Sequence, residues 1–298
     1  MTTEPGHAGL ALTHEHDRAL RVSWRDRELF RYVYRPWDDQ RESPRPYLHP
    51  MWTLDGRPVS LYRPHDHVWH KGLSLALSNV GADNFWGGPS YLRSYGGYAQ
   101  LPNNGTQRHD GFSRLVADAS CVGVTEELTW LAEDGRAVFA EERTLDVVAL
   151  PDDNAWRLDL TTALRNTSGA ELVIGSPETE GRAGAAYSGL FWRGPRSFSG
   201  GTVRIPDAEG TDELNGARAP WMAFTGRHDG DGEHATLLMA DQDGPTAWFA
   251  RSEVYAVLCP AAFAEVRRVG PDETLRLAYR VVVADGDLDH KTCARLAG

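Results

Sequence analysis

Runs of alternating apolar and polar residues, separated by short polar turns, recur along most of this chain. Neighbouring side chains of a β-strand point to opposite faces, so this alternation is typical of strands that bury one face. The runs cover residues 20–24, 28–34, 121–131, 137–150, 155–166 and 171–174, and then 221–225, 235–240, 246–251, 254–259 and 275–284. Many short strands joined by polar turns favour a sandwich or a barrel. We therefore predict an all-β fold built as a large antiparallel β-sandwich.

Only the end of the chain has the pattern of a helix. We expect a short C-terminal helix over residues 287–298, with Asp287 as its N-cap and Gly298 past its end. Residues 1–17 are expected to be a flexible tail. No linker rich in Pro, Gly and Ser divides the chain, and a β-sandwich of 298 residues can form one domain. A single domain over residues 1–298 is the simpler prediction.

Composition and charge exclude several classes of protein. The formal net charge is −11, which argues against a nucleic-acid partner because such a surface needs a basic stripe. No apolar run is long enough to span a bilayer, and the first residues lack the pattern of a secretory signal. The three cysteines form no Cys-x-x-Cys pair and suit a reducing compartment. We expect a cytoplasmic protein without a membrane partner, and a homo-oligomer stays open.

Motifs that bind common cofactors are missing from the sequence. There is no Gly-x-Gly-x-x-Gly opening a helix and no Gly-Lys-[Ser/Thr] phosphate loop. A Gly-x-Ser-x-Gly nucleophile elbow is also missing. We therefore expect no nucleotide cofactor.

Three of the eleven histidines lie within six positions, at His65, His67 and His70. Imidazole titrates near neutral pH and is the commonest metal ligand in proteins. If His65 and His67 lie on a strand they share a face, and His70 joins them if the chain turns after Val68. The alternative is a surface turn stabilised by histidine hydrogen bonds. We favour a functional site, because one such turn does not need three imidazoles.

Two segments rich in glycine and aromatic residues interrupt the strand pattern, at residues 81–111 and 178–196. Long irregular loops on a sheet are where binding and catalytic groups concentrate. Trp86 and Trp192 lie in these segments, and exposed aromatic rings beside glycines suit a flat hydroxylated ligand such as a sugar. The alternative is that these rings only pack at the edges of the sheets.

The histidine cluster permits two mechanisms. As metal ligands, His65, His67 and His70 would present three nitrogens to a divalent ion, and Glu178 or Glu180 would complete the set. Without a metal, one histidine and one carboxylate would move protons at a carbon next to a carbonyl group. The sequence leaves both mechanisms open.

Around the histidines we expect groups that bind and orient a substrate. The arginines would hold an oxyanion or a hydroxyl group, and the tryptophans would stack on the ligand. The residues expected to bind substrate are Trp86, Arg182, Trp192, Arg193 and Lys71. Tyr187 and Glu178 would join the three histidines as catalytic groups, with Tyr187 as the acid.

Four motifs together resemble a family of bacterial proteins. They are RPYLHP at residues 45–50, RPHDHVWHKGL at 63–73, NFWGG at 84–88 and EGRAGAAYSGLFWRGPR at 180–196. Their order is that of the family labelled PmoA (DUF6807), and the resemblance covers residues 21–285. It implies a role in carbohydrate catabolism and a large sandwich like that of the aldose mutarotases.

Two hypotheses about function follow. The first is a carbohydrate-active enzyme that abstracts a proton from a sugar or keto-sugar, leading to elimination, epimerisation or hydrolysis. A divalent metal bound by the histidines would be its cofactor. The second is a non-catalytic sugar-binding or accessory protein, in which the same groups only stack and donate hydrogen bonds.

Overall fold

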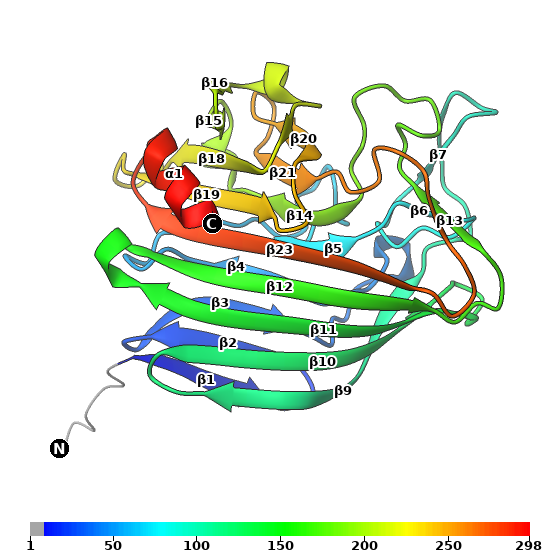
Figure 1. The fold of residues 1–298 in the computed structure, drawn as a ribbon, viewed down its shortest axis with the longest axis horizontal. Coiled ribbons are helices and arrows are strands. Elements are labelled where there is room, and N and C mark those ends of the chain that lie inside the picture. Colours follow the sequence, from blue (N-terminus) through cyan, green and yellow to red (C-terminus); the bar gives the residue numbers. More distant parts are fainter. Residues whose placement is uncertain (1–8) are drawn as a thin grey trace.

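Residues 9–298, which the computed structural model describes, form two large antiparallel sheets that pack face to face (Figure 1). In spatial order the first sheet contains β1 (Leu10–Glu15), β2 (Ala19–Trp24), β3 (Arg27–Val33), β4 (Tyr47–Met51), β5 (Leu73–Ala76), β14 (Gly189–Arg193), β21 (Val257–Pro260), β20 (Thr246–Arg251) and β17 (Arg218–Ala219). The second contains β16 (Ala208–Gly210), β15 (Thr202–Ile205), β18 (Trp221–Arg227), β19 (His234–Asp241), β23 (Thr274–Asp285), β12 (Ala155–Asn166), β11 (Ala137–Leu150), β10 (Cys121–Leu131) and β9 (Thr106–Ala117). The predicted antiparallel sandwich is confirmed.

Two small sheets and a few helical turns complete the fold. The small sheets are β22 (Arg267–Val269) with β13 (Leu172–Gly175) and β6 (Asn79–Val80), and the hairpin of β7 (Ser90–Leu92) and β8 (Gly97–Ala99). Single 3₁₀ turns occur at Gln40–Glu42, Pro151–Asp153, Arg196–Phe198 and Asp212–Leu214. In Figure 1 the small sheets lie to the right, beyond the ends of the long strands.

The main core lies between the two large sheets. Phe30 of β3 packs on Trp156 of β12 with ring centroids 5.3 Å apart, and Trp192 of β14 packs on Phe224 of β18 at 5.4 Å. These four rings are almost completely buried. Burying one large apolar side chain stabilises a fold by about 1.5–3 kcal/mol, so contacts of this kind hold the sheets together.

The strand boundaries follow the alternating pattern where one face of a strand is buried. The observed bounds of β10, β11, β12 and β20 are those of the predicted runs. By contrast, β9 was not predicted. It is the edge strand of the second sheet, and its last five residues are exposed on both faces, so it needs no apolar alternation.

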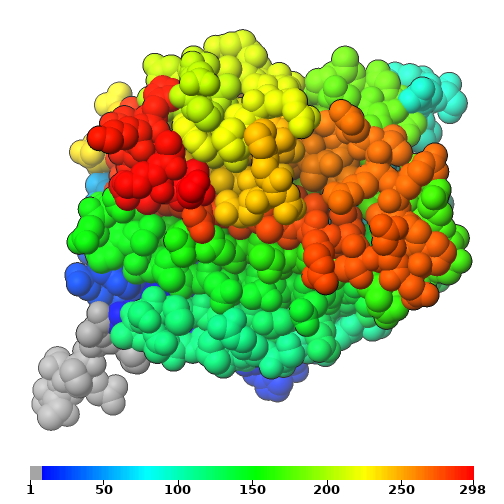
Figure 2. All heavy atoms as spheres, in the orientation of Figure 1, coloured from blue at the N-terminus to red at the C-terminus, as the bar shows by residue number. Residues whose placement is uncertain are grey.

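The C-terminal helix is present, but its first residue differs from the prediction. α1 spans His290–Ala297, and its N-cap is Asp289, whose carboxylate accepts a hydrogen bond from the Thr292 backbone N at 2.7 Å. Asp287 instead pairs with Arg204 at 2.6 Å. The helix covers the outer face of β18, β19 and β23, and Figure 2 shows it, in red, beside the yellow strands.

The expected N-terminal tail is partly wrong. Residues 1–8 lie outside the described residues, whereas Leu10–Glu15 form β1 and pair with β2. Within residues 9–298 there is no helix with the length and apolar character needed to cross a membrane. That residues 1–298 form one domain stays a prediction.

Candidate functional site

The histidine cluster lies in a closed loop rather than on a strand. An isolated bridge pairs Tyr62 with Lys71 at the base of the loop. Above it the chain makes two successive turns, in which the backbone N of His67 donates to the Pro64 O at 3.0 Å and that of His70 to the His67 O at 2.9 Å. The expectation of a shared strand face for the first two histidines is therefore wrong, because these turns rotate each side chain independently.

His67 and His70 are brought together by the second turn. Their rings stack with centroids 4.7 Å apart and an angle of 23° between the planes. His70 is 5% exposed, and burial lowers its pKa well below the usual value, so its imidazole is neutral at neutral pH. Its Nδ1 has no hydrogen-bond partner among the described residues.

His65 lies apart from this pair. It is exposed, and its Nδ1 lies 2.9 Å from the Arg196 Nη2. Within residues 9–298 no three side chains of His, Cys, Asp or Glu are placed to share a metal ion. The residues present therefore do not fit the expected three-histidine metal face.

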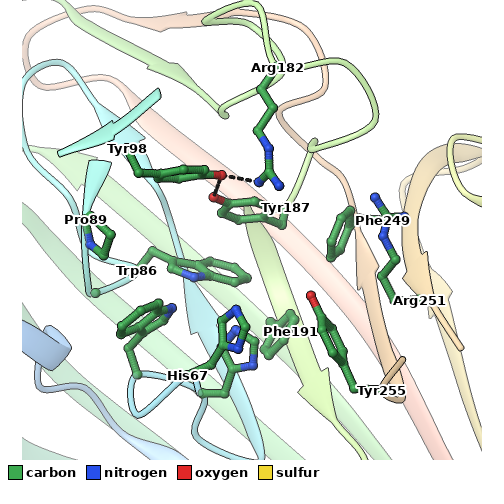
Figure 3. A pocket seen from close by; sticks show the side chains of 13 residues that line it. His67, Trp86, Pro89, Tyr98, Arg182, Tyr187, Phe191, Phe249, Arg251 and Tyr255 are labelled. Carbon is green, nitrogen blue, oxygen red and sulfur yellow. Dashed lines mark hydrogen bonds between the residues drawn. The ribbon is translucent and has the colours of Figure 1, made fainter. Parts of the chain in front are cut away.

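The stacked histidines form one side of a pocket of about 310 Å³ (Figure 3). Its lining comes from segments far apart in the sequence, and it is rich in aromatic rings. The lining residues are His67, Trp69, His70, Trp86, Gly87, Pro89, Tyr98, Arg182, Tyr187, Phe191, Phe249, Arg251 and Tyr255. The histidine loop thus meets both of the glycine- and aromatic-rich segments at this pocket.

The pocket lies on the outer face of the first sheet. Along β14, Leu190 and Trp192 belong to the core between the sheets, whereas Phe191 between them faces the pocket. Along β20, Trp248 and Phe249 divide in the same way. Strand alternation therefore makes the first sheet the floor of the pocket, and the loops build its walls.

Trp192 was expected to be a stacking wall, and the structure places it elsewhere. Its side chain is fully buried in the main core, and its Nε1 donates to the Val59 O at 2.8 Å. The neighbouring Phe191 takes the place in the pocket that we expected for Trp192. Trp86, the other expected wall, does line the pocket and packs on Tyr187 with ring centroids 4.6 Å apart.

Asp66 orients His67. One carboxylate oxygen lies 3.0 Å from the His67 Nδ1. Burial alone would raise the pKa of Asp66, but the hydrogen bond from His67 and nearby positive charges outweigh it and hold that pKa below its usual value. Because an ionised carboxylate only accepts, Nδ1 must carry the hydrogen, which leaves Nε2 as an acceptor when the ring is neutral.

A pair of tyrosines lies on another side of the pocket (Figure 3). The Tyr98 and Tyr187 hydroxyls are 2.6 Å apart, and Arg182 Nη1 donates to the Tyr98 hydroxyl. Burial, and next the neighbouring Tyr98, holds the pKa of Tyr187 well above its usual value. Tyr187 therefore keeps its proton at neutral pH and can donate it in a hydrogen bond.

Arg193 is buried beside the pocket, although it does not line it. Its guanidinium lies 4.2 Å above the ring of Tyr255, and its Nε and Nη1 have no hydrogen-bond partner among the described residues. Arg251 lies at the rim, with its Nη2 donating to the Gly184 O at 2.8 Å.

Lys71 and Glu178, two other expected site residues, do not line the pocket. Lys71 is fully buried on the other side of its loop, where it pairs with Asp38 at 3.0 Å and with Glu42. A buried lysine needs such acidic partners, so its role here is structural. Glu178 is exposed on a turn.

Arg45 ties the pocket walls to the sheet. Its Nη1 donates to the Trp86 O at 2.9 Å and its Nη2 to the Trp69 O at 2.7 Å. Nε donates to the Ser74 Oγ at 3.1 Å, which anchors the guanidinium on β5. The RPYLHP motif thus contributes a residue that holds two aromatic walls from behind.

Sequence reasoning missed several lining residues. Tyr98 belongs to a segment that was singled out but was not assigned a role. Phe249 and Arg251 lie in the run 246–251 and Tyr255 lies in the run 254–259, and both runs were predicted as ordinary strands. No local signal marks them, because they reach the site only through the pairing of β20 with β21 and of β21 with β14.

Several solved structures are similar to this chain. They include a heparan sulfate lyase HepC mutant from Pedobacter heparinus (TM-score 0.41, 11% identity, covering 95% of this chain and 36% of that chain). A second is a GH36 alpha-galactosidase AgaB from Geobacillus stearothermophilus (TM-score 0.43, 11% identity, covering 96% of this chain and 42% of that chain). A third is a galactose 1-epimerase from Lactobacillus acidophilus NCFM (TM-score 0.37, 9% identity, covering 94% of this chain and 99% of that chain).

The chain spans only 36% to 42% of the length of the lyase and galactosidase chains, and at these TM-scores the likeness carries no argument about function. No curated protein matches the sequence. One protein family matches residues 19–298, and its description is "Family of unknown function (DUF6807)". This match confirms the family resemblance of the four sequence motifs. The chain belongs to the DUF6807 family.

Proposed function

We propose that this protein is an enzyme that abstracts a proton from a sugar or keto-sugar bound in the aromatic pocket. One observation carries the proposal. The oriented base His67 with its stacked partner His70, and the protonated hydroxyl pair of Tyr98 and Tyr187, line the same small pocket. A base and a proton donor in one enclosed site are the two groups that such a reaction needs.

His67 is the better base of the two histidines. Asp66 fixes its tautomer, so Nε2 carries the free electron pair, and the carboxylate stabilises the imidazolium that forms when the proton arrives. His70 is neutral, buried and stacked against it. A neutral neighbour lets His67 gain charge, whereas a charged one would oppose it.

The tyrosine pair supplies one hydrogen to the ligand. The two hydroxyls share one hydrogen bond, so one of their two hydrogens stays available whichever oxygen donates. Arg182 also donates to Tyr98, which favours negative charge at this end of the pocket. An oxyanion that forms on the ligand would be stabilised here.

The size and walls of the pocket support a sugar-sized ligand. A volume of about 310 Å³ lies at the small end of the usual range for ligand pockets. The rings of Trp69, Trp86, Phe191 and Phe249 surround it. Aromatic faces pack against the C–H faces of a sugar ring, while the hydroxyls and arginines bind its oxygens.

The proposed step is balanced within the site. His67 Nε2 takes a proton from the carbon next to a carbonyl, so a C–H bond breaks and an N–H bond forms. The electron pair becomes the C=C bond of an enolate, whose oxygen accepts a hydrogen bond from the tyrosine pair. Return of a proton from His67 to the same face, after its N–H has exchanged with water, gives isotope exchange, and protonation from the opposite face gives epimerisation. If a substituent on the next carbon departs with its bonding electron pair, the carbonyl re-forms, the proton on His67 passes to the leaving group or to water, and the result is elimination.

Deuterium exchange tests this step without knowledge of the final product. A panel of keto-sugars is incubated with the protein in D₂O, and proton NMR follows the signal of the hydrogen on the carbon next to the carbonyl. We expect this signal to disappear for at least one keto-sugar. His67→Ala should slow the exchange by a factor of about 10²–10⁴, which is the usual contribution of a general base.

Matched variants separate chemistry from binding. Tyr187→Phe should keep the fold and slow the exchange, because it removes one of the two hydroxyls. His234→Ala removes an exposed imidazole at the start of β19 and should leave the rate unchanged. If keto-sugars bind and no exchange occurs, the protein is a sugar-binding protein. If no keto-sugar binds or exchanges, the proposed function is wrong.

A further inference from the structure

The pocket is cationic although the protein as a whole is acidic. Two arginines and two histidines are among the thirteen lining residues, and none of the thirteen is Asp or Glu. The chain carries a formal net charge of −11. An acidic protein that collects basic groups around one small pocket is suited to an anionic ligand, because the local charges dominate at contact distance.

The positive charge of Arg182 is not balanced by a carboxylate of the described residues. Its Nη1 donates to the Tyr98 hydroxyl, and its guanidinium lies 4.9 Å from the centre of that ring. Glu180 pairs with Arg93 and Asp212 with Arg251, and within residues 9–298 no carboxylate forms an ion pair with Arg182. A neutral phenol leaves the positive charge uncompensated, and the remaining N–H groups are free to bind a ligand.

Arg251 is held in place at the same side of the pocket (Figure 3). Its Nη1 and Nη2 donate to the carbonyls of Ala250 and Gly184, at 2.7 and 2.8 Å. Asp212 lies 3.9 Å away and balances part of its charge. The carbonyl bonds keep the guanidinium fixed at the rim, so it can orient a ligand without first losing its own freedom.

A third arginine adds to the positive field from behind the wall. Arg193 is 1% exposed and has two guanidinium nitrogens without a hydrogen-bond partner in the described part of the chain. Its guanidinium lies over Tyr255, which lines the pocket. Burial disfavours its charge, and Asp66 is the acidic group that favours it most. A buried cation with incomplete partners is costly unless something negative comes close.

We infer that the sugar bound here carries a single carboxylate, held by Arg182 and Arg251. This inference rests on the proposed function and names its substrate class as the sugar acids. Asp212 lies 3.9 Å from Arg251 and offsets part of its charge. Asp66 favours the charge of Arg193 but also lies 3.5 Å from Arg196. Arg182 has no ion pair within residues 9–298, so its charge is the one that the ligand would balance. One carboxylate balances one guanidinium, whereas a dianionic phosphate carries more charge than that.

The two ends of the pocket then have separate tasks. Figure 3 shows Arg182 with the tyrosine pair on the side away from His67, and Arg251 beside Phe249. A carboxylate at the arginine end positions the sugar ring between the aromatic walls. The carbonyl of the ligand then lies at the tyrosine pair, and the carbon next to that carbonyl faces His67.

Calorimetry with matched sugars tests the inference. The probes are D-glucuronate with D-glucose, D-galacturonate with D-galactose, and glucose 6-phosphate. We expect at least one acid to bind about tenfold or more tightly than its neutral parent, as charge-assisted hydrogen bonds to arginine imply. Arg182→Met should remove most of this preference and change binding of the neutral sugar by less than about threefold.

Two further variants keep the test decisive. Arg251→Lys retains the positive charge but loses the fixed fork, and it should weaken binding of the acid less than Arg182→Met does. Arg295→Met removes a surface arginine of α1 that pairs with Asp153, and it should leave the affinities for the acid and for the neutral sugar unchanged. The unfolding midpoint of each variant shows whether its fold is intact.

The outcomes are distinct. The inference is wrong if the unchanged protein binds acids and neutral sugars equally or binds none of the probes. It is also wrong if Arg182→Met keeps the preference for acids or loses binding of the neutral sugar as well. Tighter binding of glucose 6-phosphate than of any acid overturns the assignment of a carboxylate. Keto-sugar exchange without a preference for acids overturns this inference and leaves the proposed function standing. A preference for acids without exchange overturns the proposed function and leaves this inference standing.

Discussion

At the scale of single residues, two histidines of one loop have opposite surroundings. His67 stacks on His70 inside the pocket and is oriented by Asp66. His65, two positions earlier, is exposed and contacts Arg196. In the expected metal site the two histidines would be equivalent metal ligands. In the observed loop only His67 of these two lines the pocket.

Alanine variants of these histidines distinguish the two views. We expect His67→Ala to slow exchange by a factor of about 10²–10⁴ and to weaken ligand binding. His65→Ala should keep both within about twofold of the unchanged protein, since exposed side chains away from a site contribute little. Metal analysis of both purified variants accompanies the kinetics. Equal loss of activity and of a stoichiometric divalent metal in the two variants would restore the three-histidine metal site.

The prediction of individual site residues depended on how locally each one is determined. His67, His70 and Trp86 lie in segments whose composition is unusual in itself, and they line the pocket. Trp192 was misassigned by one position, because the segment was read as a loop, whereas it contains β14. On a strand, a shift of one residue moves a side chain to the opposite face.

At the scale of elements, the pocket depends on one buried arginine that connects two loops to a strand. The Arg45 guanidinium makes five hydrogen bonds, including those to the carbonyls of Trp69 and Trp86. Burial lowers its pKa to about 10, so it stays charged at neutral pH. Three of these bonds come from Nη1, whose two N–H groups are shared among three carbonyls, and Nε and Nη2 make one each. A planar guanidinium with five N–H groups can reach all of these acceptors, whereas an ammonium has only three N–H groups.

Arg45→Lys should therefore be destabilising despite its retained charge. We expect a loss of about 3 kcal/mol in the free energy of unfolding, since buried acceptors lose their partners. Ligand affinity should fall as well, because two aromatic walls are released. Urea denaturation and calorimetry measure the two effects. The matched surface variant Arg295→Lys should stay within about 0.5 kcal/mol. Unchanged binding in Arg45→Lys would show that the walls are held by other contacts.

Elements with one buried face were predictable from the sequence, and others were not. β10, β11 and β12 are each paired on both sides within a sheet, and more and less buried residues alternate along most of each strand. β14 is buried on both faces, since one face meets the core and the other the pocket. A strand of that kind has no alternation, and its glycines and aromatic residues resemble a loop.

At the scale of the whole molecule, two buried histidines and one half-buried histidine couple the free energy of unfolding to pH. They lie in separate places: His49 in β4, His70 at the pocket and His228 after β18. Burial lowers the pKa of each below the usual 6.5, and that of His49 to about 4. The unfolded chain therefore binds protons on these residues at a pH where the folded protein does not.

The sign of the effect follows from this difference. Well above pH 6.5 these histidines are neutral in both the folded and the unfolded state, so they do not reduce the free energy of unfolding. As pH falls from 6.5 toward 4, the unfolded state gains protons first and the folded state loses relative stability. Within that window His49 contributes up to about 1.4 kcal/mol per pH unit, and the lowered pKa values of His70 and His228 act in the same direction below pH 6.5. We expect the urea midpoint to fall steadily over the same range.

His49→Gln isolates one part of this coupling. The His49 Nδ1 lies 2.8 Å from the Ser60 Oγ, and a glutamine amide can replace that hydrogen bond without a titratable group. Between pH 6 and pH 4.5 we expect the slope of unfolding free energy against pH to decrease by about 1.4 kcal/mol per unit. His234→Gln, at an exposed position, should leave the slope unchanged. An equal slope in His49→Gln and the unchanged protein would mean that the pKa of His49 is not lowered in the folded state, as solvation of its half-buried ring would allow.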